Sequence, residues 1–136
     1  MDYRRYVIAL REYGKVGPKG FQQLLLHLGS PDQVFNATLG QISSLPRFTI
    51  EKAKIILEAQ QRLPEIDRTI EELESNHIHI FTILDENYPE LLRQIDDPPP
   101  LLYYKGEFPL DASLPYIGII GTTEATQDGI ASAVAL

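Results

Sequence analysis

The sequence predicts a protein of the α+β to α/β class, with a helical domain over residues 1–63 and a connecting helix and first strands over residues 64–136. Three observations support this division. In the first half, apolar residues recur at the three- and four-residue spacing of amphipathic helices. The second half holds short apolar runs rich in Ile, Leu and Tyr, which are typical of strands. Pro64 disfavours helix in the residue before it, so we place the domain boundary there.

The first half predicts short helices joined by tight turns. A first helix carries one apolar stripe, and a proline suits the first turn of the second helix. The stretch "SPDQVF" predicts a third helix with a capping box formed by Ser30 and Gln33, and "TLGQI" predicts another box formed by Thr38 and Gln41. Thr49 is expected to cap the helix that follows the turn "SLPRFT".

The second half begins with an acidic helix that ends near Asn76. The run "HIHIFTIL" predicts a buried strand, "DENYPELLRQI" a loop and a short helix, and "LLYYKG" a second strand. "YIGIIG" predicts a third strand, with a helix following in "TQDGIASAVAL". A strand, a glycine loop and a helix begin a βαβ unit, but no parallel partner strand follows before Leu136. We therefore expect the chain to be a fragment of a longer protein.

The net charge of −7 is unevenly distributed along the chain. Residues 1–63 hold nine Lys and Arg against five Asp and Glu, whereas residues 64–136 hold three against fourteen. Binding to phosphates needs Lys and Arg, so the first half is the better candidate for contact with DNA. A solvated charged surface explains the same pattern. With no Cys and no long apolar run, the sequence predicts neither disulfides nor a membrane span, and we expect a cytoplasmic location.

The stretch "YGKVGPKGFQQLL" has features of a helix–hairpin–helix motif, whose turn and following helix N-terminus hold a phosphate through backbone N–H groups. Val16, Gly17 and Lys19 are the DNA-binding candidates here, while Lys15 stands where the usual pattern has its first glycine. "SLPRFTIEKAKII" is a second copy without the glycines, so we expect it to keep the helical shape and to lack the phosphate-binding turn. A helical packing or protein-interaction module is the alternative for the first copy.

The loop "IIGTTEATQDG" supplies a second set of DNA-binding candidates: Gly121, Thr122, Thr123 and Gly129. A strand that runs into a glycine and then a helix N-terminus is the geometry of phosphate cradles in Rossmann-like folds. The loop matches neither GxGxxG nor a Walker sequence, and an ordinary strand–helix turn is the alternative.

The sequence contains no convincing catalytic or metal site. His77 and His79 share one face of a predicted strand, but no third ligand completes a metal site. No pairing of a nucleophile with a base stands out, so we expect a protein without catalytic residues, metal or cofactor.

Residues 85–106 follow the pattern D-x-x-YP-x-x-L-x-x-I-x-D-x-PP-x-L-Y-x-x-G, matched here from Asp85 through Tyr88, Asp97 and Tyr103 to Gly106. In this pattern the chain resembles the DprA/Smf family (DNA-processing protein A), of which it would be an N-terminal portion that ends early in a Rossmann-like domain. The prolines fix φ and remove N–H donors, which predicts a rigid extended spacer rather than a catalytic element.

The resemblance implies a helix–hairpin–helix/SAM-like domain followed by a Rossmann-like domain. It also implies a non-enzymatic protein of natural transformation that binds single-stranded DNA, helps to load the RecA recombinase, and forms a homodimer through the missing domain. Thr122 and Thr123 replace the Ser and Arg of the family's phosphate loop, which removes a cationic partner for phosphate. We therefore expect this chain alone to bind DNA weakly or not at all.

Two other readings remain open at this stage. In the first reading, the chain is a protein-interaction module. In the second, it is a Rossmann-like nucleotide-binding enzyme, and this reading rests only on Gly121 and the threonines that follow it. Salt separates DNA binding from apolar docking, because binding through cations weakens as salt rises. The cations concerned are Lys15, Lys19, Arg47, Lys52 and Lys54.

Overall fold

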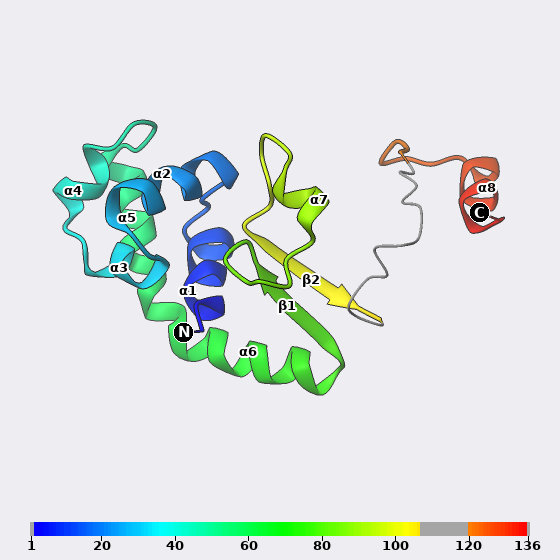
Figure 1. The fold of residues 1–136 in the computed structure, drawn as a ribbon, viewed down its shortest axis with the longest axis horizontal. Helices are drawn as coiled ribbons and strands as arrows, with labels where there is room; N and C mark the ends of the chain where they lie inside the picture. Colours follow the sequence, from blue (N-terminus) through cyan, green and yellow to red (C-terminus); the bar gives the residue numbers. More distant parts are fainter. Residues whose placement is uncertain (1, 107–119, 136) are drawn as a thin grey trace.

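The computed structural model describes residues 2–106 and 120–135 (Figure 1). The elements are α1 (Arg4–Ile8), the π-helical turn η1 (Ala9–Tyr13), α2 (Pro18–Leu28), α3 (Pro31–Asn36), α4 (Leu39–Ser43), α5 (Ile50–Glu58), the 3₁₀ turn η2 (Ala59–Arg62), α6 (Leu63–Ser75), β1 (Ile78–Thr82), α7 (Glu90–Arg93), β2 (Leu101–Lys105) and α8 (Gln127–Ala135). The described residues therefore form a mixed α+β fold, as predicted. The helix–hairpin–helix/SAM-like and Rossmann-like assignments stay predictions.

One hydrophobic cluster links the helices to the strands. Helices α1 to α5 gather at one end of the molecule, and α6 runs from them to the strand pair (Figure 1). Helix α6 packs against α1, and β1 packs against both. Val7 of α1, Ile66 of α6, Ile80 of β1 and Leu101 of β2 all belong to the same buried cluster. Residues on both sides of Pro64 thus share a core, and a domain boundary there remains a prediction.

Side-chain caps start two of the short helices, as the sequence predicts. The backbone N–H of Gln41 donates to Thr38 Oγ1 at 3.2 Å, and the Thr38 N–H donates to Gln41 Oε1 at 2.8 Å. This reciprocal pair is the capping box of α4. Thr49 caps α5 by accepting a hydrogen bond from the Lys52 N–H at 3.3 Å.

The prediction of a capping box at the start of α3 is wrong. Ser30 is the N-cap residue, but its side chain makes no capping hydrogen bond. The Ser30 hydroxyl instead donates to Asp32 Oδ1 at 2.6 Å, a charged acceptor two residues along the chain. This charge-assisted hydrogen bond orients the Ser30 side chain toward Asp32, and its oxygen accepts no bond from the N–H groups of the first helical turn.

Strands β1 and β2 pair antiparallel, with Ile80 opposite Tyr103 and Thr82 opposite Leu101. Both strands were predicted, as was the short helix α7 between them. Strand β1 is half-buried rather than fully buried, because His79 is exposed while Ile80 and Thr82 are buried. The third predicted strand falls largely on residues 116–119, which lie outside the described residues.

Three side chains within residues 85–106 hold the long connection between β1 and β2 in place. Asp85 accepts hydrogen bonds from the Thr82 N–H at 2.6 Å and the Thr82 hydroxyl at 2.9 Å. The Tyr88 side chain is almost fully buried, and its hydroxyl donates to the Pro99 carbonyl at 2.8 Å. Arg93 lies over the Tyr88 ring at 5.2 Å and donates to backbone carbonyls of the same connection. This arrangement supports the prediction that the proline stretch is a structural spacer.

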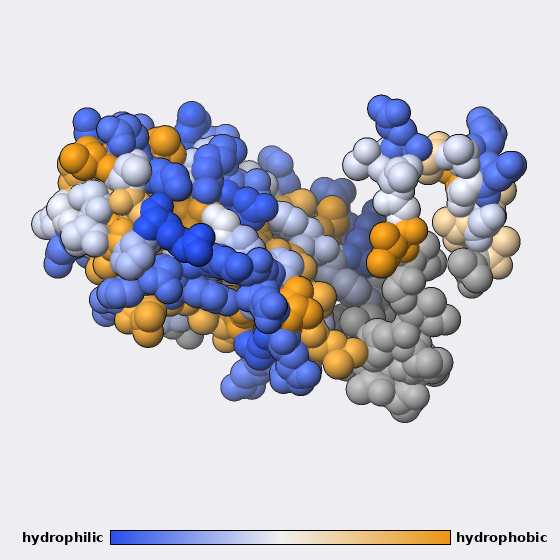
Figure 2. Space-filling view, turned by 90° about the horizontal axis from the view of Figure 1, so that it is seen from above, coloured by the Kyte–Doolittle hydropathy of each residue, from blue (hydrophilic) through white to orange (hydrophobic). Residues whose placement is uncertain are grey.

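Hydrophilic residues cover much of the helical end in the view of Figure 2, with isolated hydrophobic residues between them. Residues 120–135, which include α8, are exposed throughout. Among the helices of the described ranges, none is long and apolar enough to cross a membrane.

Replacing Tyr88 by Phe is expected to lower the free energy of unfolding by about 1 kcal/mol, because the Pro99 carbonyl loses its hydrogen-bond donor. Burial raises the pKa of the Tyr88 hydroxyl above its usual value, against a smaller opposing effect of Arg93. The stability that protonated Tyr88 contributes is therefore intact below about pH 10 and is lost as the pH rises through the folded-state pKa.

Urea denaturation of both proteins between neutral pH and about pH 11 measures this effect. The Tyr88→Phe curve should fall less steeply at the alkaline end than the wild-type curve. Parallel alkaline slopes in the two proteins would show that Tyr88 ionisation does not contribute.

Candidate nucleic-acid interface

The first candidate turn follows a π-helical ending of the first helix. The N–H of Gly14 donates to the Ala9 carbonyl at 2.8 Å, five residues back, and the Val16 N–H donates to the Leu10 carbonyl at 3.0 Å. A Cβ on Gly14 would lie 2.7 Å from the Leu10 carbonyl oxygen, so this tight ending requires glycine. Lys15 then adopts φ 53°, in the left-handed region that usually favours glycine. Gly17 becomes the N-cap of α2.

The second hairpin repeats this backbone course. Arg47 adopts φ 74°, Phe48 follows, and Thr49 is the N-cap of α5. Arg47 reaches the left-handed region without glycine, so the second copy keeps the shape of a turn, and its expected lack of phosphate binding stays a prediction. In both hairpins a basic residue takes the left-handed position, an apolar residue comes next, and a helix begins two residues later.

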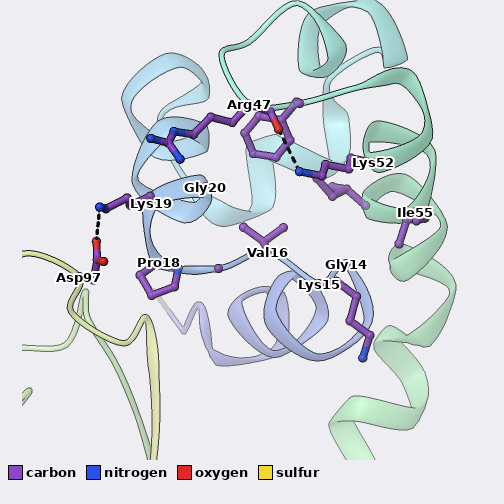
Figure 3. Close-up of a pocket in the computed structure, with 13 residues that line it drawn as sticks. Gly14, Lys15, Val16, Pro18, Lys19, Gly20, Arg47, Lys52, Ile55 and Asp97 are labelled. Carbon is purple, nitrogen blue, oxygen red and sulfur yellow. Dashed lines mark hydrogen bonds and ion pairs between the residues drawn. The ribbon is translucent and has the colours of Figure 1, made fainter.

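The two turns pack against each other through Gly20. A Cβ at this position would lie 3.3 Å from Val16 Cγ1 and 3.4 Å from Phe48 Cζ, so the absence of a side chain lets the second turn approach α2. A cavity of about 520 Å³ opens between the turns (Figure 3). Its lining runs from Gly14 to Gly20 and continues through Arg47, Phe48 and Lys52 to Ile56 of α5.

Basic side chains surround this cavity. Lys19 Nζ lies 3.4 Å from Asp97 Oδ1, an acid that comes from the proline connection far along the chain. Lys52 Nζ donates to the Arg47 carbonyl at 3.2 Å, on the opposite side of the cavity (Figure 3). The Lys15 side chain extends away from Lys19 and Arg47. Among the described residues, Arg47 and Lys52 form no ion pair with a carboxylate.

Other cations of the first half have acidic partners on α6. Arg4 forms ion pairs with Asp2 and Glu74, and Arg5 pairs with Asp67 at 3.1 Å. The hydrogen bond from Arg4 holds the pKa of Asp2 below its usual value. Part of the charge asymmetry is therefore used inside the fold, where basic α1 contacts acidic α6, while Arg47 and Lys52 at the cavity have no carboxylate partner among the described residues.

The cavity brings together one of the two predicted sets of site residues. Val16, Gly17 and Lys19 all line it. Val16 is buried, Gly17 is partly exposed and Lys19 is exposed, so the backbone of the turn and the lysine remain within reach of solvent.

The second set, Gly121, Thr122, Thr123 and Gly129, does not line the cavity. These residues lie in the exposed segment 120–135. The Thr122 hydroxyl donates to the Glu124 carbonyl at 2.9 Å, and the Gly129 N–H donates to Thr126 Oγ1 at 3.2 Å. A phosphate at this helix start would have to displace Thr126 from the Gly129 N–H.

Phe48, Ile55 and Asp97 are among the lining residues that the predicted site did not include. The repeated order of a basic residue, an apolar residue and a helix start is the signal that points to Phe48. Asp97 belongs to the 85–106 pattern, but nothing in that pattern places it beside a turn near residue 17.

The comparisons with known proteins agree on one family. Residues 79–136 match the family described as DNA recombination-mediator protein A. The chain is 30% identical over 106 residues to "DNA processing protein DprA" of Bacillus subtilis (strain 168). The aligned region is 78% of this chain and 36% of that protein. The chain is also 30% identical over 130 residues to "Protein Smf" of Synechocystis sp. (strain ATCC 27184 / PCC 6803 / Kazusa), which covers 91% of this chain and 32% of that protein. No solved structure matches significantly.

The family description and the names of both relatives are those of DNA-processing and recombination-mediator proteins. The comparisons support the DprA/Smf family for this chain, as the 85–106 pattern predicted. The chain spans about a third of the length of each of these relatives.

Substituting glycine at Lys15 or Arg47 is expected to raise the free energy of unfolding by about 0.5–1 kcal/mol in each case. The left-handed conformation costs an L side chain about 1–2 kcal/mol, and the greater freedom of glycine in the unfolded chain cancels part of that gain. Urea denaturation measures the change.

Lys52→Gly is the matched control, because it removes a positive charge from the same cavity but stands inside α5. It should destabilise the protein by about 1 kcal/mol. Destabilisation by all three substitutions would argue against strained turns.

Proposed function

We propose that the chain is part of a DNA-processing protein of recombination, and that the basic surface around the two turns contacts the backbone of single-stranded DNA. The single observation that carries this proposal is the convergence of Lys19, Arg47 and Lys52 on one cavity, beside the N-termini of α2 and α5. Helix N-termini and lysine or arginine side chains are the groups that hold phosphates without reading sequence.

The names of the relatives support a role in DNA processing and recombination. By resemblance to the family, the whole protein would protect single strands during natural transformation, present them to a RecA-type recombinase, and act as a homodimer. This function is binding and delivery, with no catalytic step. The helix–hairpin–helix character of the two turns is part of the same proposal.

The affinity of this chain alone is expected to be low. Few cations surround the cavity, and non-specific binding to nucleic acid depends on the number of phosphates neutralised. Residues 64–136 are strongly acidic, which repels a polyanion from the rest of the molecule. A binding measurement therefore needs low ionic strength.

A second candidate function is docking of a protein partner. Leu91, Leu92 and Ile95 of the α7 region are exposed by 58%, 36% and 47%. Apolar side chains gathered on one short segment are typical of surfaces that bind protein. Docking of this kind depends little on salt, which separates it from binding through the cations of the cavity.

Lys52→Gln is expected to weaken binding to a fluorescent oligothymidylate and to make the plot of log affinity against log salt shallower by about 0.7, the contribution of one phosphate contact in a single strand. Fluorescence anisotropy at several low salt concentrations measures both quantities. Arg47→Gln should behave in the same way.

Lys54→Gln is the matched control, since Lys54 is an exposed lysine of the same helix that does not line the cavity. It should change both quantities less than Lys52→Gln does. Equal effects of the two substitutions would mean that DNA meets the general charge of α5 and not the cavity. Binding that ignores salt would favour the protein-docking function.

A further inference from the structure

We propose that the cavity between the two turns is a nucleotide pocket: it accepts one unpaired base against its apolar wall, with the neighbouring phosphate at its basic rim. We further infer that Asp97 occupies the position of that phosphate in the free protein. The inference rests on the proposed function and deepens it, since it names what part of the strand enters the site.

The lining of the cavity has two chemically different parts. Val16 and Ile56 are buried at 4% and 1% exposure, and Phe48 and Ile55 complete an apolar wall beside them. Ile55 is 43% exposed, although it is a large apolar side chain among lysines and arginine. A site that recognised phosphate alone would have no use for this wall, whereas a base has an apolar face to lay against it.

The size of the cavity fits a ligand larger than a phosphate. A volume of about 520 Å³ lies within the range of roughly 300–1,000 Å³ that is usual for small-molecule sites. A base inside a duplex is stacked and paired, and it would have to leave the helix to enter. A pocket that takes up one unpaired base would therefore favour single strands.

Asp97 marks the place of the phosphate. Its carboxylate lies 3.4 Å from Lys19 Nζ at the edge of the cavity (Figure 3). It is carried there by the proline connection, which the Tyr88–Pro99 hydrogen bond holds in place. A phosphate that binds Lys19 must compete with this carboxylate, so the free protein is partly blocked by its own acid.

An acidic peptide with apolar side chains is the other ligand that such a lining could accept. The backbone favours the nucleotide, because the N-terminus of α2 lines the cavity together with the cations. Oriented N–H groups of this kind suit a phosphate with several acceptor oxygens.

The test compares two oligonucleotides of the same length and phosphate number, oligothymidylate and a fully abasic strand, by fluorescence anisotropy at low salt. Oligothymidylate should bind more tightly by about five-fold or more, since one base–protein stacking contact contributes on the order of 1–3 kcal/mol. Ile55→Asn should bring the ratio of the two affinities close to one.

Ile50→Asn is the matched control, because Ile50 is 53% exposed on the same helix and does not line the cavity. It should leave the ratio unchanged. Asp97→Asn should tighten binding of both strands by about two- to five-fold, the range expected for an exposed ion pair. Its neighbour Asp96 forms no ion pair within the described residues, so Asp96→Asn should have a smaller effect.

The possible results separate this inference from the proposed function. Equal, salt-dependent binding of the two strands would overturn the base pocket and leave phosphate binding intact. No binding of either strand at low salt would overturn both. Displacement of the oligonucleotide by a Glu- and Leu-containing peptide at lower concentration than by free oligothymidylate would overturn the nucleotide assignment in favour of a protein ligand.

Discussion

The hydrogen bond from the buried Tyr88 hydroxyl to the Pro99 carbonyl is the constraint on which the arrangement of the site depends. Tyr88 and Pro99 lie at opposite ends of the connection between the two strands, and their contact closes that connection into a fixed loop. Arg93 packs over the Tyr88 ring, and Asp85 ties the start of the loop to Thr82. Because prolines stiffen the returning segment, closing the loop also fixes the direction of the residues just before it. Asp97 is one of these residues, and it reaches the first hairpin turn at Lys19.

Each of the two hairpins places a basic residue at a left-handed backbone position. Lys15 and Arg47 hold left-handed positions where glycine would be less strained, so each turn carries a cation at some cost in stability. The two cations are placed differently: the side chain of Lys15 points away from the cavity, while Arg47 extends across α2 toward the side of Lys19 (Figure 3). Two turns of the same shape thus make an asymmetric site, open to an anion mainly between Lys19 and the second turn.

Local signals could be predicted from the sequence, whereas contacts between distant segments could not. The caps at Thr38 and Thr49 and both strands follow from short-range patterns, and the structure contains them. The capping box predicted at Ser30 is absent, and the Ser30 side chain is oriented instead by donating to Asp32, an acceptor that the four-residue pattern does not consider. The left-handed conformation of Arg47 escaped prediction, since the surrounding packing and not glycine produces it. A Cβ at Gly20 would crowd Val16 and Phe48 from the two turns, and this approach of distant segments leaves no mark in the sequence periodicity. DNA binding by the second set of candidates, around Gly121, remains a prediction.

The hydrophobic cluster that runs from α1 to β2 fixes how charge is distributed over the molecule. It joins a predominantly basic group of short helices to a predominantly acidic helix and strand pair within one core. Charges fixed at opposite ends of a folded unit give it a permanent dipole moment, and a polyanion exerts a torque on such a molecule before any contact forms. In the proposed function, this dipole would turn the protein during its approach, so that the hairpin end faces the nucleic acid in the first encounters. The acidic half would in this way help to orient the molecule.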